Sequence, residues 1–409
     1  MCRDFRLTFI QIMATKKDKK FKYDVAIIGG LGHVGLPLGL VFANKGMKVC
    51  LHDKDTKNAE LVKSGVMPFI EYGADPILKK LVGKKDALTI SSDIQDVSLA
   101  KYVVIAIGTP VDEYLNPNVR IFLEYFSTLK KYLRKNQTII IRSTIYPRTC
   151  QQIMKILGKD TQLAYCPERI AQGYAIKELK ELPQLVAGIS LKAQNSAVKL
   201  FEVIAPKIIK ISMEEAELVK LFTNAWRYIQ FSITNQFYMI ANDFNLDFNR
   251  IRQVMADGYG RAYNIPSAGF AAGPCLLKDT MQLAAFNNNN FLLGHAAMMV
   301  NEGLPNFIVE DLRKRHDISK KKIGILGMAF KADIDDTRDS LSFKLGKILR
   351  FHGAKVFYSD EYAKDPTFVS KELLVKECEI VIIGAPHSAY KKLKIPKKVE
   401  VVDAWGMLG

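Results

Sequence analysis

A single cysteine stands among charged and small residues in one short stretch, SAGFAAGPCLLKDT, at positions 267–280. Gly273 and a proline lead directly into Cys275, and Lys278 and Asp279 follow within one helical turn. The run after the cysteine is typical of a helix, so we expect Cys275 at a helix N-terminus. There the helix dipole and the Lys278 ammonium would favour the thiolate, the nucleophilic form of cysteine. A packing role for the same thiol stays open at this point, because most cysteines are small core residues.

A lysine and an asparagine share one face of a predicted long helix. From Ser212 the sequence keeps a helical period for about 30 residues, and Ser212 and Glu215 have the spacing of a capping box. Lys220 and Asn224 lie four residues apart, so their side chains project from the same side. A lysine on a helix usually faces water, but Lys220 has apolar neighbours on both sides. We therefore expect Lys220 to belong to a site.

The elements that must position these residues begin with two apolar runs, at 23–28 and 48–52, that indicate buried strands. A helix is predicted between them at 34–45, and a G-x-G-x-x-G turn joins it to the first strand. Such glycines let the backbone approach a pyrophosphate, and the helix N-terminus offers N–H groups and a positive dipole end. An acid after the second strand would bind ribose hydroxyls and disfavour the extra phosphate of NADP.

This pattern predicts NAD as the cofactor, the alternative being a glycine turn kept only for packing. The residues expected to bind the cofactor in this segment are Gly30, Leu31, Gly32, His33, Val34, Gly35 and Asp53. Two further apolar runs, at 102–110 and 137–147, end in hydroxyl residues and proline, as parallel strands do at their carboxyl ends. Because ligands of open α/β sheets bind at those ends, we expect four more residues at the cofactor: Thr109, Pro110, Ser143 and Thr144.

A second strand–turn–helix unit begins at 321–330 and repeats the opening pattern without its full fingerprint. The predicted fold is α/β, with two Rossmann-like doubly wound domains joined by a long central helix and a helical middle domain. The expected divisions are a disordered basic leader at 1–20, a cofactor domain at 21–210, a central domain at 211–310 and a C-terminal domain at 311–409. The leader also has a weak likeness to a signal peptide, and Met13 could be the true start.

Composition narrows the classes of protein that fit. The chain has 409 residues, 48% of them hydrophobic, and a formal net charge of +17. No apolar run is long enough to span a membrane, and the basic residues carry no nucleic-acid-binding signature, so we expect anionic small molecules as ligands. The six cysteines lie far apart, without a disulfide or metal pattern, which fits the reducing cytoplasm and predicts no metal site.

With these motifs in place, the chain resembles the UDP-glucose/GDP-mannose dehydrogenase family from about residue 23 to 405. The motifs that carry the resemblance are, in order, GGLGHVG, IGTP, RSTIYPRT, CPERIAQG, AELVKLFTNA, GFAAGPCLLKD and GMAFKADIDDTRDS. The resemblance implies NAD-dependent oxidation of the C6 hydroxyl of a nucleotide sugar to a carboxylate, with two NAD used per turnover. The segments GTPVDEYLNP and CPER look more like the branch that acts on UDP-N-acetylhexosamines than like the UDP-glucose branch.

The resemblance also implies roles for individual residues. Cys275 would add to an aldehyde intermediate, because a four-electron oxidation passes through an aldehyde that has no hydride to give until a nucleophile adds. The other catalytic residues that it implies are Lys220 and Asn224 at the C6 oxygen, Asp279 in acid–base steps, Glu168 in thioester hydrolysis and Thr144 beside the water. Substrate contacts are implied for Glu168, Arg169, Lys220, Asn224, Arg261, Tyr263, Gly269, Phe270, Phe330 and Lys331. Arg338 would pair with a cofactor phosphate, and Arg261 would reach the neighbouring subunit's site, so we expect a homodimer or a larger homo-oligomer.

Some positions depart from the family pattern, namely Gln172, Arg148, Gln236 and the pair at 271–272. They leave the choice of sugar open, so UDP-glucose or GDP-mannose is the alternative substrate. Two other classes also stay open. One is a β-hydroxyacid dehydrogenase of the 6-phosphogluconate type, which needs neither the cysteine loop nor a second α/β domain. The other is a nucleotide-sugar-binding protein without turnover.

Overall fold

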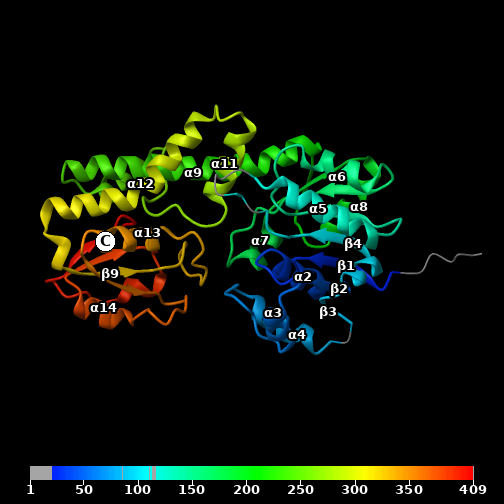
Figure 1. Ribbon diagram of the computed structural model, residues 1–409, viewed down its shortest axis with the longest axis horizontal. Helices are drawn as coiled ribbons and strands as arrows, with labels where there is room; N and C mark the ends of the chain where they lie inside the picture. The colour runs from blue at the N-terminus through cyan, green and yellow to red at the C-terminus, as the bar shows by residue number, and fades with distance from the viewer. Residues whose placement is uncertain (1–20, 85, 110, 113–116, 409) are drawn as a thin grey trace, which may run out of the picture.

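The computed structural model describes residues 21–84, 86–109, 111–112 and 117–408. Two lobes, each built around a sheet, are joined along one side by a long helix (Figure 1). The chain enters the lobe on the right of that view and ends in the lobe on the left. The expected leader at 1–20 and the cofactor candidate Pro110 lie outside the described residues.

The N-terminal lobe holds, in the described part of the chain, a sheet of eight strands in the order β3-β2-β1-β4-β5-β6-β7-β8. Its strands are β1 (Tyr23–Ile28), β2 (Val49–His52), β3 (Leu88–Ser91), β4 (Ala100–Ile105), β5 (Thr138–Ile141), β6 (Gln162–Tyr165), β7 (Gln184–Gly188) and β8 (Ile208–Lys210). Its helices are α2 (Gly35–Asn44), α3 (Thr56–Lys63), α4 (Ala74–Val82), η1 (Ile94–Leu99), α5 (Val119–Leu129), η2 (Lys130–Tyr132), α6 (Thr149–Leu157), α7 (Ala175–Glu181) and α8 (Leu191–Phe201). The strands pair in parallel except for β6 and β7, which are antiparallel.

The central strands of this sheet form because runs of apolar residues dominate them, as in β1, β4 and β5. Helices cover both faces of a doubly wound sheet, so a central strand such as β1 is buried on both sides. Each fully buried isoleucine or valine there stabilises the fold by about 1.5–3 kcal/mol. Gly30 and Gly35 close the turn between β1 and α2, since a Cβ on either one would collide with neighbouring backbone. The predicted strand–turn–helix–strand unit is thereby confirmed.

The central region is dominated by α9 (Met213–Asp243), a helix of 31 residues. The predicted capping box starts it, with Ser212 accepting from the Glu215 N–H and Glu215 accepting from the Ser212 N–H. The helix is about 46 Å long and spans from one lobe to the other (Figure 1). Three further helices belong to this region: α10 (Phe248–Ala256), α11 (Leu276–Phe286) and α12 (Leu292–Arg315). Both α11 and α12 pack against α9. The helix that follows Cys275 therefore lies beside the helix that carries Lys220.

The C-terminal lobe holds, among the described residues, a parallel sheet of four strands in the order β10-β9-β11-β12. The strands are β9 (Lys322–Leu326), β10 (Lys355–Ser359), β11 (Ile380–Ile383) and β12 (Glu400–Val402), and the helices are η3 (Ile318–Lys320), α13 (Leu341–Phe351), α14 (Lys371–Glu377) and η4 (Ser388–Lys392). The predicted α/β, helical, α/β organisation is confirmed. Each helix in the described part of the chain is too short or too polar to cross a bilayer.

Candidate active site

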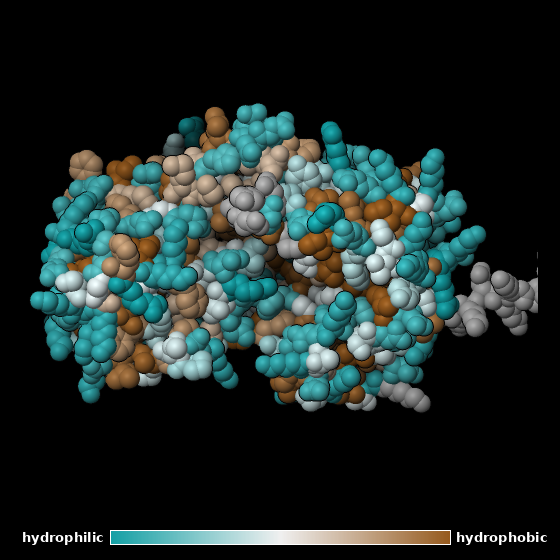
Figure 2. All heavy atoms as spheres, viewed as in Figure 1, coloured by the Kyte–Doolittle hydropathy of each residue, from teal (hydrophilic) through white to brown (hydrophobic). Residues whose placement is uncertain are grey.

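A cleft of about 310 Å3 opens where the two lobes and α9 meet. Figure 2 shows this part of the surface hollowed between the lobes. Residues of all three parts of the chain line it: His33, Val34, Glu168, Ile170, Ala171, Gln172, Lys220, Asn224, Arg227, Phe231, Phe270, Ala271, Ala272, Gly273, Pro274, Cys275, Leu276, Phe330, Lys331, Ala332, Pro386 and Trp405. Candidates from four separate motifs of the sequence therefore come together in one place.

An ion pair joins Lys220 of α9 to Glu168 of the CPER segment, with 2.9 Å between Lys220 Nζ and Glu168 Oε1. Both side chains are nearly inaccessible, at 5% and 12% exposed. Burial alone would raise the pKa of Glu168, but Lys220 outweighs it and holds that pKa below the ordinary value. Burial would likewise lower the pKa of Lys220, and Glu168 and Asp279 reverse the shift and raise it. Lys220 is therefore a fixed cation at neutral pH, suited to hold negative charge on a substrate oxygen.

Asn224 and Asp279 form a second contact, with Asn224 Nδ2 donating to Asp279 Oδ2 at 2.6 Å. Asp279 belongs to the first turn of α11 and is fully buried. Its other oxygen, Oδ1, lies 3.5 Å from Lys278 Nζ and accepts no hydrogen bond in the described part of the chain. A buried carboxylate oxygen with a free lone pair can take a water or a substrate hydroxyl.

Cys275 is the N-cap residue of α11, as its sequence position predicts, and it is exposed to the cleft. Gly273 aims it: this glycine has φ +96°, and a Cβ there would collide with the Phe330 ring. The pKa of this thiol differs from the prediction that the helix N-terminus and Lys278 would favour the thiolate. Desolvation and Asp279 raise the pKa of Cys275 more than Lys220 and Lys278 lower it, so the thiol is protonated in this state. A base or a bound ligand must therefore help to activate it.

The loop before Cys275 is fixed by buried amides. Asn235 of α9 accepts from the Gly269 N–H at 2.8 Å and donates to the Gly269 carbonyl at 3.0 Å. Asn301 of α12 accepts from the same Asn235 amide at 2.9 Å. A Cβ on Gly269 would collide with the Trp405 ring, so this position needs glycine. Phe270 then points into the cleft lining.

The C-terminal lobe contributes Phe330 and Lys331 to the opposite wall. Lys331 Nζ donates to the Gln172 carbonyl at 3.2 Å, across the boundary between the lobes. Burial and the positive charge of Arg227 lower the pKa of Lys331. Arg227 of α9 and Lys331 of the C-terminal lobe are therefore two cations that line the same cleft from different parts of the chain. This arrangement favours an anionic ligand between them.

The cofactor fingerprint is folded as a dinucleotide site requires. No side chain caps the N-terminus of α2, whose first turn belongs to the described residues. The nearest atom to a Cβ built on Gly32 is 3.7 Å away, so the surface beside this glycine is open for a close approach. Asp53 follows β2 directly, and its Oδ2 accepts from the Leu31 N–H at 3.0 Å. These residues fit NAD, with the pyrophosphate at the helix N-terminus and a ribose at Asp53.

We expect Asp53→Ala to raise the KM for NAD about tenfold or more and to reduce the preference for NAD over NADP. The change removes both the acceptor for the ribose hydroxyls and the negative charge that repels a 2′-phosphate. Steady-state kinetics with each cofactor would measure it. Asp55→Ala is the matched control, because Asp55 is a nearby exposed acid that caps α3. An unchanged KM for NAD in the Asp53 variant would contradict the assignment.

Three further cofactor candidates, Ser143, Thr109 and Arg338, have partners within the protein. Ser143 Oγ donates to the Ile107 carbonyl at 2.6 Å, and Thr109 accepts from Lys278 Nζ at 3.3 Å. Arg338 makes a two-pronged contact with Asp336, with 3.0 Å between Nε and each carboxylate oxygen. Its pairing with a cofactor phosphate stays a prediction.

Part of the predicted set lies outside the cleft lining, and this includes the buried Asp279 and the loop residue Gly269. Thr144 is half-buried and is not among the lining residues. Arg169 turns the other way, donating to the Pro183 carbonyl. Arg261 and Tyr263 are exposed between α10 and α11, with Arg261 stacked beside Tyr259. Contacts of these residues with substrate stay predictions.

Arg227, Phe231 and Trp405 line the cleft but were not among the sequence candidates. The sequence did contain a signal for Arg227 and Phe231. Positions 220, 224, 227 and 231 are three or four residues apart, so they share one face of the helix. Trp405 had no such signal, since it comes from the end of the other lobe. Arg148, one of the departures, has φ +68°, in the left-handed region that favours glycine, and donates its N–H to Glu217.

Three family models match the chain, and together they span most of it. Residues 23–205 match the NAD binding domain of the UDP-glucose/GDP-mannose dehydrogenase family, residues 214–302 match its central domain, and residues 324–409 match its UDP binding domain. The three matches follow the order of the two sheets and the helical region between them.

Individual relatives agree with these matches. The UDP-N-acetyl-D-mannosamine dehydrogenase of Pyrococcus horikoshii is 28% identical over 386 residues, which is 90% of each chain. A solved structure of that enzyme superimposes with a TM-score of 0.85, covering 94% of this chain and 96% of its own. A UDP-glucose dehydrogenase from Pyrobaculum islandicum has the same TM-score at 23% identity, covering 96% of each chain, and so shares the fold. The chain thus belongs to the UDP-glucose/GDP-mannose dehydrogenase family, whose members are NAD-dependent nucleotide-sugar dehydrogenases.

Proposed function

We propose that the protein oxidises the C6 hydroxyl of a UDP-N-acetylhexosamine to a carboxylate. The observation that carries the proposal is one cleft lined by Cys275, by the Lys220–Glu168 pair and by Lys331, together with Asn224, whose amide is held from behind by the buried Asp279. A nucleophile, an oxygen-binding cation and amide, and a cationic wall for a diphosphate are what such a reaction needs. NAD, when bound, accepts the hydride in each of the two oxidations.

In the first oxidation the chain stabilises charge on one oxygen. Lys220 and Asn224 hold the C6 oxygen while its proton leaves and the carbon loses hydride to become an aldehyde. Lys220 acts here as a cation, in agreement with its raised pKa. Asp279 Oδ1, which accepts no hydrogen bond from the described residues, takes a water that carries the proton away.

In the second phase the carbon becomes covalently bound to the protein. The thiol of Cys275 adds to the aldehyde carbon, its proton passes to the carbonyl oxygen, and a thiohemiacetal results. Loss of hydride from that carbon and of the hydroxyl proton gives a thioester. Water then hydrolyses the thioester, releasing the carboxylate and a proton and returning the thiol. In this proposal Glu168 orients the water, and its ion pair with Lys220 supports the role, because the carboxylate becomes free to do so when Lys220 binds the substrate oxygen.

The sugar is proposed from the relatives. The curated relatives from Pyrococcus horikoshii and Methanocaldococcus jannaschii, at 28% and 29% identity, are both named UDP-N-acetyl-D-mannosamine dehydrogenases. A panel of UDP-N-acetylmannosamine, UDP-N-acetylglucosamine, UDP-N-acetylgalactosamine, UDP-glucose and GDP-mannose would test it by NADH formation. The proposal expects an N-acetylhexosamine to give the highest kcat/KM. A preference for UDP-glucose or GDP-mannose would overturn the choice of sugar, and no turnover with any of them would overturn the reaction.

The cytoplasm is the proposed compartment. The described cysteines other than Cys275 are buried and free, with their pKa values raised by desolvation. Thiols that stay unpaired and protonated suit a reducing environment, where NAD is also available.

A dimer or larger homo-oligomer is proposed because α9 carries an exposed apolar stripe. The stripe consists of large apolar side chains of α9 and of its C-cap residue, which are 40–72% exposed and recur at helical spacing: Phe222, Trp226, Ile233, Phe237, Ile240 and Phe244. Figure 2 shows tan and brown side chains along the same upper edge of the molecule. Monomers seldom leave so long an apolar stripe open, so a second copy of the chain is its proposed cover.

We expect light scattering to report at least a dimer, and Trp226→Glu to weaken association about a hundredfold or more. A charge buried within the stripe would have no partner. Phe351→Glu is the control, because Phe351 is 85% exposed on α13, away from the stripe. A wild-type monomer with full activity would contradict the proposal.

A further inference from the structure

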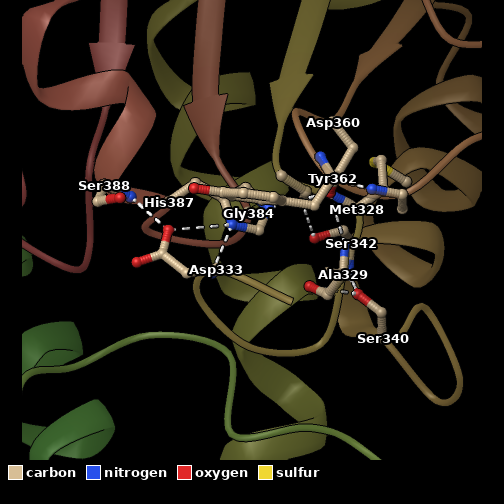
Figure 3. A network of polar contacts seen from close by, with 12 residues as sticks. Met328, Ala329, Asp333, Ser340, Ser342, Asp360, Tyr362, Gly384, His387 and Ser388 are labelled. Carbon is tan, nitrogen blue, oxygen red and sulfur yellow. Dashed lines mark hydrogen bonds and ion pairs between the residues drawn. The ribbon is translucent and has the colours of Figure 1, made fainter. Parts of the chain in front are cut away.

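A buried histidine lies at the edge of the C-terminal sheet where its parallel strands end. Asp360 follows β10, His387 comes shortly after β11, and Asp333 belongs to the loop after β9. These three strands are neighbours in the sheet, so their carboxyl ends bring the three side chains together. Figure 3 shows Asp333 and Ser388 on one side of the network and Asp360 and Met328 on the other.

The two ring nitrogens of His387 have different partners. Nδ1 accepts from the Asp333 backbone N–H at 2.8 Å, so it carries no proton, and Nε2 lies 3.0 Å from Asp360 Oδ2. The proton is therefore on Nε2 and is donated to the Asp360 carboxylate. The side chains of His387 and Asp360 are both 0% exposed. Asp360 is already well satisfied by backbone N–H groups, those of Met328, Ala329, Tyr362 and Ala363.

Asp333 connects this network to the cleft wall, because it directly follows the lining residues Lys331 and Ala332. Its backbone has φ +57°, a conformation that a non-glycine residue keeps only when its surroundings hold it. His387 holds its N–H, and the Ser388 N–H donates to its carboxylate at 2.7 Å. Its carbonyl accepts from Tyr72 Oη of the N-terminal lobe at 2.8 Å.

The same loop carries residues of the cleft wall. Lys331 stands two residues before Asp333 and reaches the Gln172 carbonyl, and Asp335 accepts from the Ile70 N–H at 3.2 Å. Pro386, the neighbour of His387, lines the cleft itself. Loss of the Asp333 anchor would therefore disturb the position of Lys331 and the closure of the two lobes.

We propose that His387 is a positioning residue for nucleotide binding, which acts by holding Asp333 and thereby the segment 331–336 against the cleft. The inference deepens the proposed function, since it rests on Lys331 contacting the nucleotide part of the substrate. His387 touches neither substrate nor cofactor, being buried behind that segment.

Two substitutions separate the two bonds of the ring. His387→Gln keeps a donor for Asp360 and removes the acceptor for the Asp333 N–H. His387→Asn places an acceptor where Nδ1 stood and removes the donor to Asp360, which keeps its backbone donors. We expect His387→Gln to bind UDP about tenfold more weakly, and His387→Asn to stay within about twofold of wild type. Isothermal titration with UDP measures both, and the KM for the nucleotide sugar should rise in the Gln variant with kcat little changed.

Ser388→Pro provides a second variant that leaves the histidine intact. Ser388 is the first residue of η4 and His387 has φ −63° and ψ 133°, so proline fits the backbone while removing the N–H that Asp333 accepts. It should weaken UDP binding severalfold, whereas the control Ser388→Ala keeps the N–H and should not. Hydrogen exchange over 331–336 should accelerate in the Gln and Pro variants only.

Equal loss of UDP affinity in the Gln and Asn variants would overturn the inference, since Asp360 or core packing would then be the cause. Wild-type affinity in both His387→Gln and Ser388→Pro would overturn it as well. UDP binding is measured without turnover, so the role of His387 can be tested even if the protein oxidises none of the nucleotide sugars in the panel. Conversely, a negative result for His387 does not affect the conclusion about which sugar is oxidised.

Discussion

Cys275→Ala is expected to abolish carboxylate formation, lowering kcat by about a thousandfold or more, while UDP and NAD still bind. The aldehyde carbon would have no nucleophile to form the thiohemiacetal, so the second hydride could not leave. Mass spectrometry of the sugar product, together with NADH formation, measures the loss. Retained affinity for UDP would show that the fold and the cleft are intact.

Alkylation of the wild-type protein gives an independent control on this thiol. Among the described cysteines Cys275 alone is exposed, so iodoacetamide should add chiefly there and the adduct should be absent in Cys275→Ala. Because the protein atoms around the sulfur desolvate it and Asp279 lies nearby, the pKa of the thiol is raised, and the rate should climb with pH beyond the ordinary cysteine value of about 8.5. Carboxylate formed at a wild-type rate by the Ala variant would rule out the covalent route.

Lys220→Met is expected to have the second largest effect, on both rate and stability. The change removes the cation at the C6 oxygen, for which we expect kcat to fall about a thousandfold. It also leaves Glu168 buried without its partner, and breaking a buried ion pair costs about 3–5 kcal/mol of the free energy of unfolding. Steady-state kinetics and denaturant unfolding measure the two effects separately.

The double variant Lys220→Met with Glu168→Gln is the informative companion. Replacing the carboxylate by a neutral amide should restore much of the lost stability without restoring the rate. If the double variant recovered both, Lys220 would have a structural role only. If Lys220→Met kept a normal kcat despite its lower stability, the oxygen-binding role would be wrong.

The fold could be predicted far into its detail because local signals agree with the final structure. The glycine turn before α2, the capping box of α9 and the apolar runs of β1 and β9 each specify their element within a few residues. These features depend on neighbours in the sequence, so periodicity and turn chemistry are enough to find them.

The arrangement of the site could not be predicted from the sequence, because it depends on contacts between residues far apart in the chain. Lys220 pairs with Glu168, 52 residues away, and Asn224 with Asp279, 55 residues away. The helical spacing in α9 predicts that Lys220 and Asn224 lie on one face of the helix. Which residues that face contacts depends on how both lobes fold around α9. Arg169, chosen through its motif, donates to the Pro183 carbonyl, a contact that no local pattern indicates.

The thiol shows how surroundings can override a local rule. A helix N-terminus and a lysine favour the thiolate of Cys275, and the sequence places both beside it. Desolvation and the negative charge of Asp279 are stronger, and the pKa of the thiol rises instead. Such a balance depends on burial and on charges from other elements, which the sequence does not list side by side.

The central claim is a four-electron oxidation through Cys275, and its most direct test is the ratio of NADH formed to nucleotide sugar consumed. The account predicts two NADH per sugar with the preferred UDP-N-acetylhexosamine, and the carboxylate as the product. One NADH per sugar, with an aldehyde as the product, would contradict it.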